Sequence, residues 1–226
     1  MNAGTIQNRE SFLATLKEKL VDIPYEPYKA PTDLPQRHLA DKTVEELLDM
    51  AKAQSEAVSA NLVETTSGEL NQVLAGLIEN AGGGQIMIPD DPQFEQFGVE
   101  IYSPKLVKWQ KGPEHREENI TNAQNSNVAV AFARFFLAES ATIAVESSAG
   151  QGRSLHFLPT HYISIIPQSR VVAHMTQAAE WFDAHKVDGS SLNFISGPSN
   201  SGDIEMQLVI GLHGPLEINY VIVKDL

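Results

Sequence analysis

Residues 61–89 read NLVETTSGELNQVLAGLIENAGGGQIMIP, and their pattern indicates the fold class. The pattern predicts a strand at 61–66 and then a helix that Ser67 caps, because apolar residues recur at helical spacing as far as Asn80. Three glycines end this helix, and a continuous apolar strand at 85–89 follows. Continuous apolar strands that alternate with helices are typical of a parallel sheet covered on both faces.

Similar strands recur along the rest of the chain, with a helix expected between Met175 and His185. These further strands are predicted at 142–145, 162–166, 192–195 and 218–223. We expect these strands to join one sheet, which predicts a three-layer α/β/α architecture of the Rossmann-like kind.

The first 54 residues are expected to form an N-terminal appendage to an α/β domain at 55–226. An amphipathic helix is predicted near 12–20. Four prolines at 22–37 exclude a helix interior there, so this segment is expected to be an extended strap. A second helix follows, which Thr43 caps with Glu46 three residues later, in a capping-box pattern.

The chain has 226 residues, no cysteine and a formal net charge of −13. Without cysteine it can form no disulfide, no thiolate zinc site and no cysteine-held iron–sulfur cluster. The negative charge argues against binding to nucleic acid or to anionic lipid. No apolar run approaches the roughly 18 residues that span a bilayer. We therefore expect a cytoplasmic protein without nucleic-acid or membrane partners.

Residues 194–205, FISGPSNSGDIE, run from an apolar strand into a loop and then into an acidic segment that suits a short helix. Gly197 permits a tight turn, and Ser199 and Ser201 offer hydroxyl groups. Ligands of open α/β sheets bind at the carboxyl ends of the strands, so this loop is a candidate binding site. The alternative is a turn in which the serines only cap a helix.

His213 lies within Gly211-Leu212-His213-Gly214-Pro215. A loop histidine between glycines is a candidate general acid or base, although single histidines are more often structural. The two histidines His156 and His161 are not at helical spacing, and no metal site is expected.

Two further segments carry polar side chains. Residues 138–142, AESAT, hold the acid Glu139 and the hydroxyl of Thr142, either as a pocket-lining loop or as a helix end and turn. Arg153 follows two glycines, and arginine is the natural partner of a carboxylate or a phosphate. The alternative for Arg153 is a solvated surface position.

Together these segments resemble the lactate utilisation (LUD) domain family, and in length and layout the chain is similar to the C-type members of that family. The resemblance covers about residues 55–226. The family pattern G-P-S-x-T-A-D-I-E is matched from Gly197 to Glu205, with Ser201 and Gly202 in place of threonine and alanine. G-x-H-G-P follows at 211–215.

The family's A-D-T-G-T segment aligns with 138–142, where Glu139, Ser140 and Ala141 replace the usual residues. The acid and hydroxyl types are retained in this alignment, but the segment departs from the pattern at these three positions. Arg153, followed by Leu158-Pro159, fits the family's arginine and Leu-Pro stretch before a strand.

The resemblance implies a fold similar to the NagB/RpiA/CoA-transferase group. It also implies a role in the oxidation of L-lactate to pyruvate beside iron–sulfur partner subunits. The clusters would then belong to the partners alone, because this chain has no cysteine and no G-x-G-x-x-G dinucleotide motif. No cofactor of its own is evident.

On this interpretation the chain binds a small carboxylate or phosphate. The candidate ligand-binding residues are Arg153, Gly197, Ser199, Ser201, Thr142 and Gly214, and the candidate catalytic residues are His213, Glu139 and Asp203. Two alternatives stay open: a scaffold or regulatory subunit with a vestigial pocket, and a stand-alone enzyme of the cyclo-ligase or CoA-transferase type with Glu139 as nucleophile or base. The sequence leaves the ligand's identity and the oligomeric state open.

Overall fold

The computed structural model describes residues 7–20, 27, 29, 32–187, 189–204 and 207–226. The chain divides into two units, Met1–Leu34 and Pro35–Leu226. In chain order the elements are α1 (Arg9–Leu20), α2 (Leu34–Arg37), α3 (Val44–Ala57), β1 (Asn61–Thr65), α4 (Leu70–Asn80), β2 (Ile86–Ile88), α5 (Gln93–Gln96), β3 (Leu106–Lys108), η1 (Pro113–His115), α6 (Arg116–Asn125), β4 (Val128–Phe132), β5 (Phe135–Leu137), η2 (Ala138–Ser140), β6 (Thr142–Ser147), α7 (Arg153–Phe157), β7 (His161–Pro167), η3 (Gln168–Arg170), β8 (Val171–Val172), α8 (Met175–His185), β9 (Ser191–Ser196), β10 (Asn200–Ile204), β11 (Gln207–Ile210) and β12 (Glu217–Val223).

In the first unit the predicted N-terminal helix is present as α1. The proline strap predicted at 22–37 falls largely outside the described residues. At its end the prediction of an extended strap is wrong, because Leu34–Arg37 form the short helix α2 at the boundary between the two units. Pro35 stands in the first turn of this helix, where a backbone N–H has no partner within the helix and proline is tolerated. No helix in the described part of the chain combines the length and apolarity needed to cross a bilayer.

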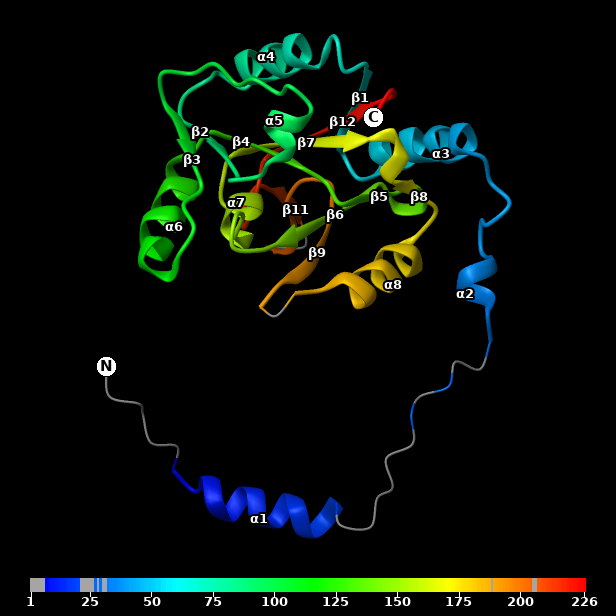
Figure 1. Cartoon of the computed structure of the whole chain (residues 1–226), viewed down its shortest axis with the longest axis vertical. Coiled ribbons are helices and arrows are strands. Elements are labelled where there is room, and N and C mark those ends of the chain that lie inside the picture. The colour runs from blue at the N-terminus through cyan, green and yellow to red at the C-terminus, as the bar shows by residue number, and fades with distance from the viewer. Residues whose placement is uncertain (1–6, 21–26, 28, 30–31, 188, 205–206) are drawn as a thin grey trace. The chain divides into compact units, whose positions relative to one another are not determined.

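The second unit is built on a six-stranded sheet in the order β1-β12-β7-β4-β2-β3 (Figure 1). Every pairing in it is parallel. Strand β4 shows why the pattern is continuously apolar, since all five of its residues are buried. The predicted α/β class with a parallel central sheet is confirmed.

The two faces of this sheet bury different elements. Val128 and Val130 of β4 pack in one core with Leu70 and Leu74 of α4. Ala129 and its neighbours on the other face pack in a second core, to which α3 and a second sheet contribute. The alternation of side chains along each strand therefore sends every second residue to the opposite layer.

The second sheet has four strands in the order β8-β5-β6-β9, and α8 covers its outer face (Figure 1). The strands predicted at 142–145 and 192–195 lie in this sheet, where they pair antiparallel, so their placement in the parallel sheet is wrong. Ile143 faces the central core while Ala144 packs against α8. A strand buried on both sides is apolar throughout, whichever sheet it joins.

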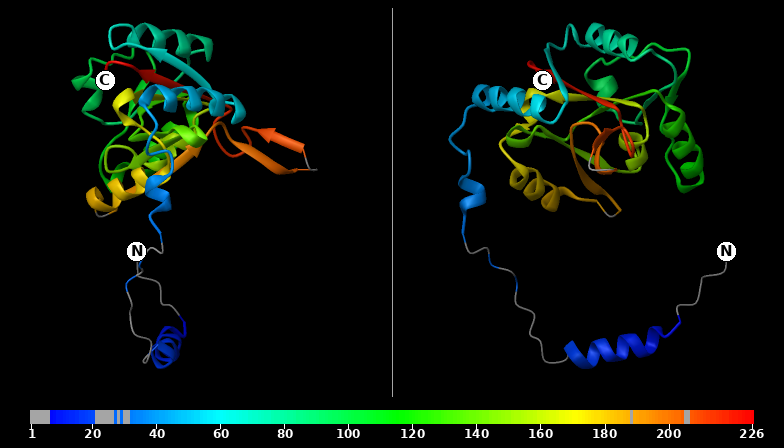
Figure 2. Two further views of the ribbon diagram at one scale, coloured as in Figure 1. Left: turned by 90° about the vertical axis from the view of Figure 1, so that its right-hand side faces the viewer. Right: turned by 180° about the vertical axis from the view of Figure 1, so that it is seen from behind.

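The helix predicted after the loop at 196–203 is also wrong, because β10 and β11 form an antiparallel hairpin there. Figure 2 shows this hairpin, in orange, projecting from the rest of the second unit. Asn200 pairs with Ile210 and Ser201 with Val209. The β-branched residues Val209 and Ile210 favour a strand, and the antiparallel partner overrides the helix preference of the acidic segment.

Helix starts were predicted with mixed success. The capping box of α3 is present, since the Glu46 N–H donates to Thr43 Oγ1 at 3.2 Å and the Thr43 N–H donates to Glu46 Oε2 at 2.9 Å. Ser67, in contrast, does not cap α4, which begins at Leu70. Its hydroxyl donates to Asp225 Oδ2 at 2.6 Å and thereby ties the end of β1 to the end of β12.

Candidate functional site

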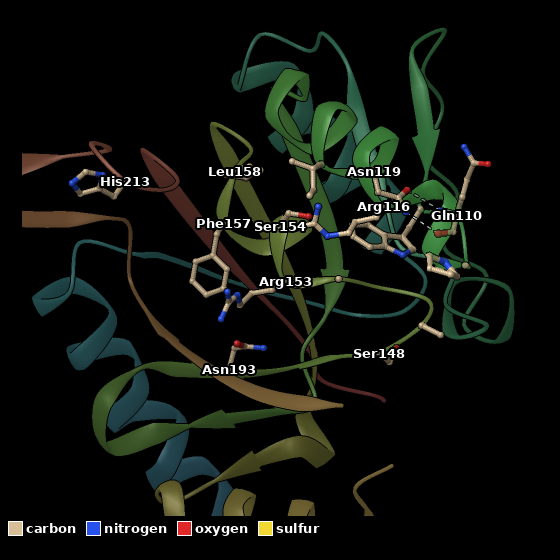
Figure 3. A pocket seen from close by; sticks show the side chains of 16 residues that line it. Gln110, Arg116, Asn119, Ser148, Arg153, Ser154, Phe157, Leu158, Asn193 and His213 are labelled. Atoms are coloured by element: carbon tan, nitrogen blue, oxygen red, sulfur yellow. Dashed lines mark hydrogen bonds between the residues drawn. The ribbon is translucent and has the colours of Figure 1, made fainter. Parts of the chain in front are cut away.

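A cavity of about 1010 Å³ opens beside α6 and α7 on the face of the central sheet that the second sheet also covers (Figure 3). We call it the arginine pocket. Its lining side chains are apolar (Trp109, Pro113, Ile120, Phe157, Leu158), polar and uncharged (Gln110, Asn119, Ser148, Ser154, Asn193) or able to carry a positive charge (Arg116, Arg153, His213), and Gly112, Ala149 and Gly152 complete the wall.

Arg153 is the first residue of α7, and its exposed side chain extends between Phe157 and Asn193 in Figure 3. Its guanidinium makes no ion pair or hydrogen bond with any residue that the structure describes. Arg116 begins α6 and pairs with Glu117. None of the described residues that line the pocket is an aspartate or a glutamate.

The wall opposite α7 depends on Trp109, which follows β3. A Cβ atom on Gly152 would lie 2.2 Å from Trp109 Cη2, so only glycine lets the indole ring approach the backbone this closely. Beside it, buried Asn119 accepts a hydrogen bond from the Gln110 N–H at 3.0 Å and donates to the Gln110 carbonyl at 2.8 Å. These contacts fix the turn from β3 into α6 and hold this wall.

The loop that carries His213 is held by Ser199. The Ser199 Oγ accepts from the His213 N–H at 3.3 Å, and the Ser199 N–H donates to the Pro215 carbonyl at 2.9 Å. A Cβ on Gly214 would lie 3.2 Å from Ser199 Cβ, so the two segments are closely packed. Ser199 and Gly214 therefore position the histidine loop, although neither lines the arginine pocket.

Gly197 has a structural setting. Its φ is +67°, and a Cβ would lie 2.1 Å from the Val58 carbonyl oxygen. Its N–H donates to the Tyr220 hydroxyl at 2.9 Å. Ser201 pairs with Val209 in the hairpin. Asp203 lies in β10, but its side chain is outside the described part of the structure.

The segment 138–142 lies away from the arginine pocket. Glu139 Oε2 lies 3.1 Å from His38 Nε2. The Thr142 hydroxyl is buried and donates to Ser196 Oγ at 3.0 Å. Neither side chain lines the pocket, so of the predicted site residues whose side chains the structure describes, only Arg153 and His213 line it.

Sequence reasoning missed Arg116 and Trp109. Both follow the three-residue strand β3, whose pattern of one half-buried residue between two exposed ones gives little strand signal. Once β3 is placed, Trp109 falls at the carboxyl end of a parallel strand, where ligands of such sheets bind, and Arg116 begins the next α-helix in the chain.

Beneath the pocket wall, α7 buries His156. Its Nδ1 lies 2.8 Å from the Tyr162 hydroxyl, and no described residue pairs with its Nε2. Burial lowers the pKa of His156 to about 3, so the ring is neutral in the folded protein near neutral pH. Among the described residues no three histidine, aspartate or glutamate side chains form a group that could hold a metal ion.

Comparison with known proteins gives a consistent result. Residues 48–223 match the family model described as LUD domain. The chain is 36% identical over 236 residues to "Lactate utilization protein C" of Macrococcus caseolyticus, with 100% of both chains covered. It is 37% identical over 242 residues to the protein of the same name from Geobacillus thermodenitrificans, again with 100% of both covered. With the Bacillus subtilis protein of that name the identity is 36% over 244 residues, with full coverage of both.

Among solved structures, the fold is similar to the crystal structure of a DUF162 family protein from Deinococcus radiodurans. The TM-score is 0.57 at 18% sequence identity, and the match covers 81% of this chain and 99% of the other. At this identity the likeness concerns the fold alone.

Proposed function

This chain belongs to the LUD domain family and has a role in lactate utilisation, and from this premise we propose that it serves the oxidation of L-lactate to pyruvate by binding a small anion in the arginine pocket. The relatives that carry the name "Lactate utilization protein C" match over their full length, which supports carrying that role over.

The observation that carries the proposal is the charge of the pocket. In a chain with a net charge of −13, one cavity is lined by two arginines and a histidine and by no described carboxylate. Arg116 pairs with Glu117 outside the lining, so Arg153 carries the unpaired charge among the described residues. A guanidinium offers a planar fork of N–H donors that matches a carboxylate or phosphate, and Arg153 has no protein partner for it among the described residues. A small carboxylate or phosphate is the ligand that this arrangement favours.

Oxidation of lactate to pyruvate releases two electrons and two protons, and this chain has no cysteine with which to hold an iron–sulfur cluster. We place the clusters on partner subunits, which would accept the electrons. The part of this chain would be to bind and orient the anion. His213, which lines the same pocket as Arg153, is the candidate group for moving a proton.

We expect Arg153→Ala to weaken anion binding by about tenfold or more, because a charge-assisted hydrogen bond contributes about 1.5–3 kcal/mol. Isothermal titration of the purified chain with L-lactate, pyruvate and inorganic phosphate measures this. Lys105→Ala, which removes the same charge at an exposed position outside the pocket, is the matched control and should bind as the wild type does. Absence of binding for all three anions, or equal affinities of Arg153→Ala and wild type, would exclude the pocket as the ligand site.

One observation favours a scaffold subunit as the second candidate. The segment 138–142 departs from the family pattern, and its polar side chains contact other protein side chains. Glu139 pairs with His38, and the Thr142 hydroxyl donates a hydrogen bond to Ser196. A scaffold subunit would be required as a whole chain and yet would tolerate Arg153→Ala.

A further inference from the structure

A second cavity, of about 1200 Å³, lies at the carboxyl ends of β2, β4 and β7. It shares Pro113, Ser148 and Ala149 with the arginine pocket and is otherwise lined by different residues. Arg134 follows β4 in the chain and Arg170 follows β7, so adjacent parallel strands deliver both side chains to the same edge of the sheet. This edge is where open α/β sheets bind their ligands.

Arg170 is a part-buried cation that forms no direct ion pair with a described carboxylate. Its Nη1 donates to the Ala133 carbonyl at 2.7 Å and its Nη2 donates to Gln93 Oε1, both of which are neutral acceptors. No described carboxylate lies within ion-pair distance of it. Asp91 is the acid that acts on it, but both carboxylate oxygens of Asp91 accept hydrogen bonds from Gln93, at 2.9 and 2.8 Å. Charges removed from water are normally paired directly, and Arg170 has only this more distant carboxylate to balance its charge within the described part of the chain.

Arg134 adds a second guanidinium at the same cavity. It lies 4.8 Å from the centre of the Trp181 ring and donates to Glu146 Oε2 at 2.9 Å. It is close enough to Arg170 that, together with burial, it lowers the pKa of Arg170. The described lining holds three cations, Lys111, Arg134 and Arg170, and three carboxylates, Asp90, Asp91 and Glu146. Lys111 pairs with Asp90 and Arg134 with Glu146, whereas Arg170 has no carboxylate within ion-pair distance among the described residues.

The wall shared with the arginine pocket supplies a hydrogen-bond acceptor. Gln151 lines the second cavity, and its Oε1 is buried without a donor among the described residues. Its backbone is fixed, since the Gln151 N–H donates to the Ser148 carbonyl at 3.2 Å. Rotation about the side-chain bonds of Gln151 alone can therefore bring Oε1 to a ligand hydroxyl, without movement of the backbone. Such a bond would satisfy an acceptor that is otherwise unpaired.

We propose that this cavity is a second binding site, for an oxyanion that also carries a hydroxyl group. The carboxylate or phosphate would lie on Arg170 and Arg134, and the hydroxyl would donate to Gln151. The site goes beyond the function proposed above, because it uses none of the charged residues of the arginine pocket. Hydroxy acids and phosphorylated polyols share this chemistry, so both belong in its test.

The test is calorimetric titration of the full chain with two matched pairs of probes. L-lactate is compared with propionate, and glycerol 3-phosphate with propyl phosphate, so that each pair differs in hydroxyl content while the anionic group is kept. We expect the hydroxylated member of at least one pair to bind more tightly, and the pair that shows it identifies the anion class. Arg170→Gln should weaken that binding by about tenfold or more.

Gln151→Met keeps the test decisive if Arg170→Gln does not fold. It should bring the hydroxylated and hydroxyl-free probes to equal affinity and leave the binding of the hydroxyl-free anion unchanged. Arg153→Ala separates the two sites, because it should weaken only the binding that belongs to the arginine pocket and leave the hydroxyl-dependent binding at the second cavity intact. Two results with the wild type would overturn the proposal: neither pair of probes binds, or the hydroxyl group makes no difference to the affinity. It would also be overturned if Arg170→Gln and Gln151→Met both bind the probes as the wild type does, or if only Arg153→Ala loses the hydroxyl-dependent binding.

Discussion

Replacement of Gly197 by alanine is expected to lower the free energy of unfolding by about 3 kcal/mol, as the sum of a left-handed backbone penalty and an overpacking penalty. The φ of Gly197 is +67°, and a Cβ would lie 2.1 Å from the Val58 carbonyl oxygen, which is backbone and cannot turn aside. Urea denaturation of the purified variant measures the change.

Gly82→Ala is the matched control. Its φ is +84°, but no atom lies within 4 Å of the added Cβ, so only the backbone penalty remains, about 1 kcal/mol. If both variants lose the same free energy of unfolding, the close contact between Gly197 and Val58 is not the reason why glycine is required at position 197. Gly197 would then be free for the ligand-binding role that the family pattern suggests.

The buried imidazole of His156 should make the protein acid-labile. Its pKa is lowered to about 3 by burial, whereas in the unfolded chain the pKa is about 6.5. Between about pH 6.5 and pH 3 the imidazole is protonated in the unfolded chain but not in the native state. The free energy of unfolding therefore falls as the pH falls, by up to about 1.4 kcal/mol per pH unit. Above about pH 6.5 both states are neutral at this ring, and the contribution is complete.

The measurement is the free energy of unfolding of wild type and His156→Gln from pH 7 to pH 4.5. Glutamine does not titrate and can still hydrogen-bond the Tyr162 hydroxyl, which His156 contacts at 2.8 Å. The difference in stability between the two proteins should shift steadily in favour of the variant as the pH falls below about 6.5. A difference that does not change with pH would show that His156 is not the group responsible.

The sequence predicts the parallel sheet well because β-α-β units leave a local signal. Apolar runs, a helical stripe and glycines at the turn mark the stretch from β1 to β2. It cannot say which sheet a buried strand joins. β6 is covered by α8 on one face and the central core on the other, so it has the apolar pattern of a parallel strand while pairing antiparallel.

The candidate site was predictable only in part, for a similar reason. Arg153 and His213 stand in glycine-containing segments, which marks them in the sequence, and the fold brings both to one cavity. Arg116 reaches the same cavity from an element that leaves no such mark. Glu139 looks like a catalytic acid by composition, but its partner is His38, a contact between residues 101 apart in the chain that no local pattern reveals.

Growth on L-lactate distinguishes an arginine pocket that serves lactate utilisation from a scaffold role. In a strain that needs this chain for growth on L-lactate, the chromosomal copy is replaced by Arg153→Ala or by Lys105→Ala, with protein levels matched to wild type. We expect the Arg153→Ala strain to grow as poorly as a strain without the chain, and the Lys105→Ala strain to grow normally. Normal growth of Arg153→Ala, alongside failure of the strain without the chain, would contradict a role of the arginine pocket and leave the scaffold role as the explanation.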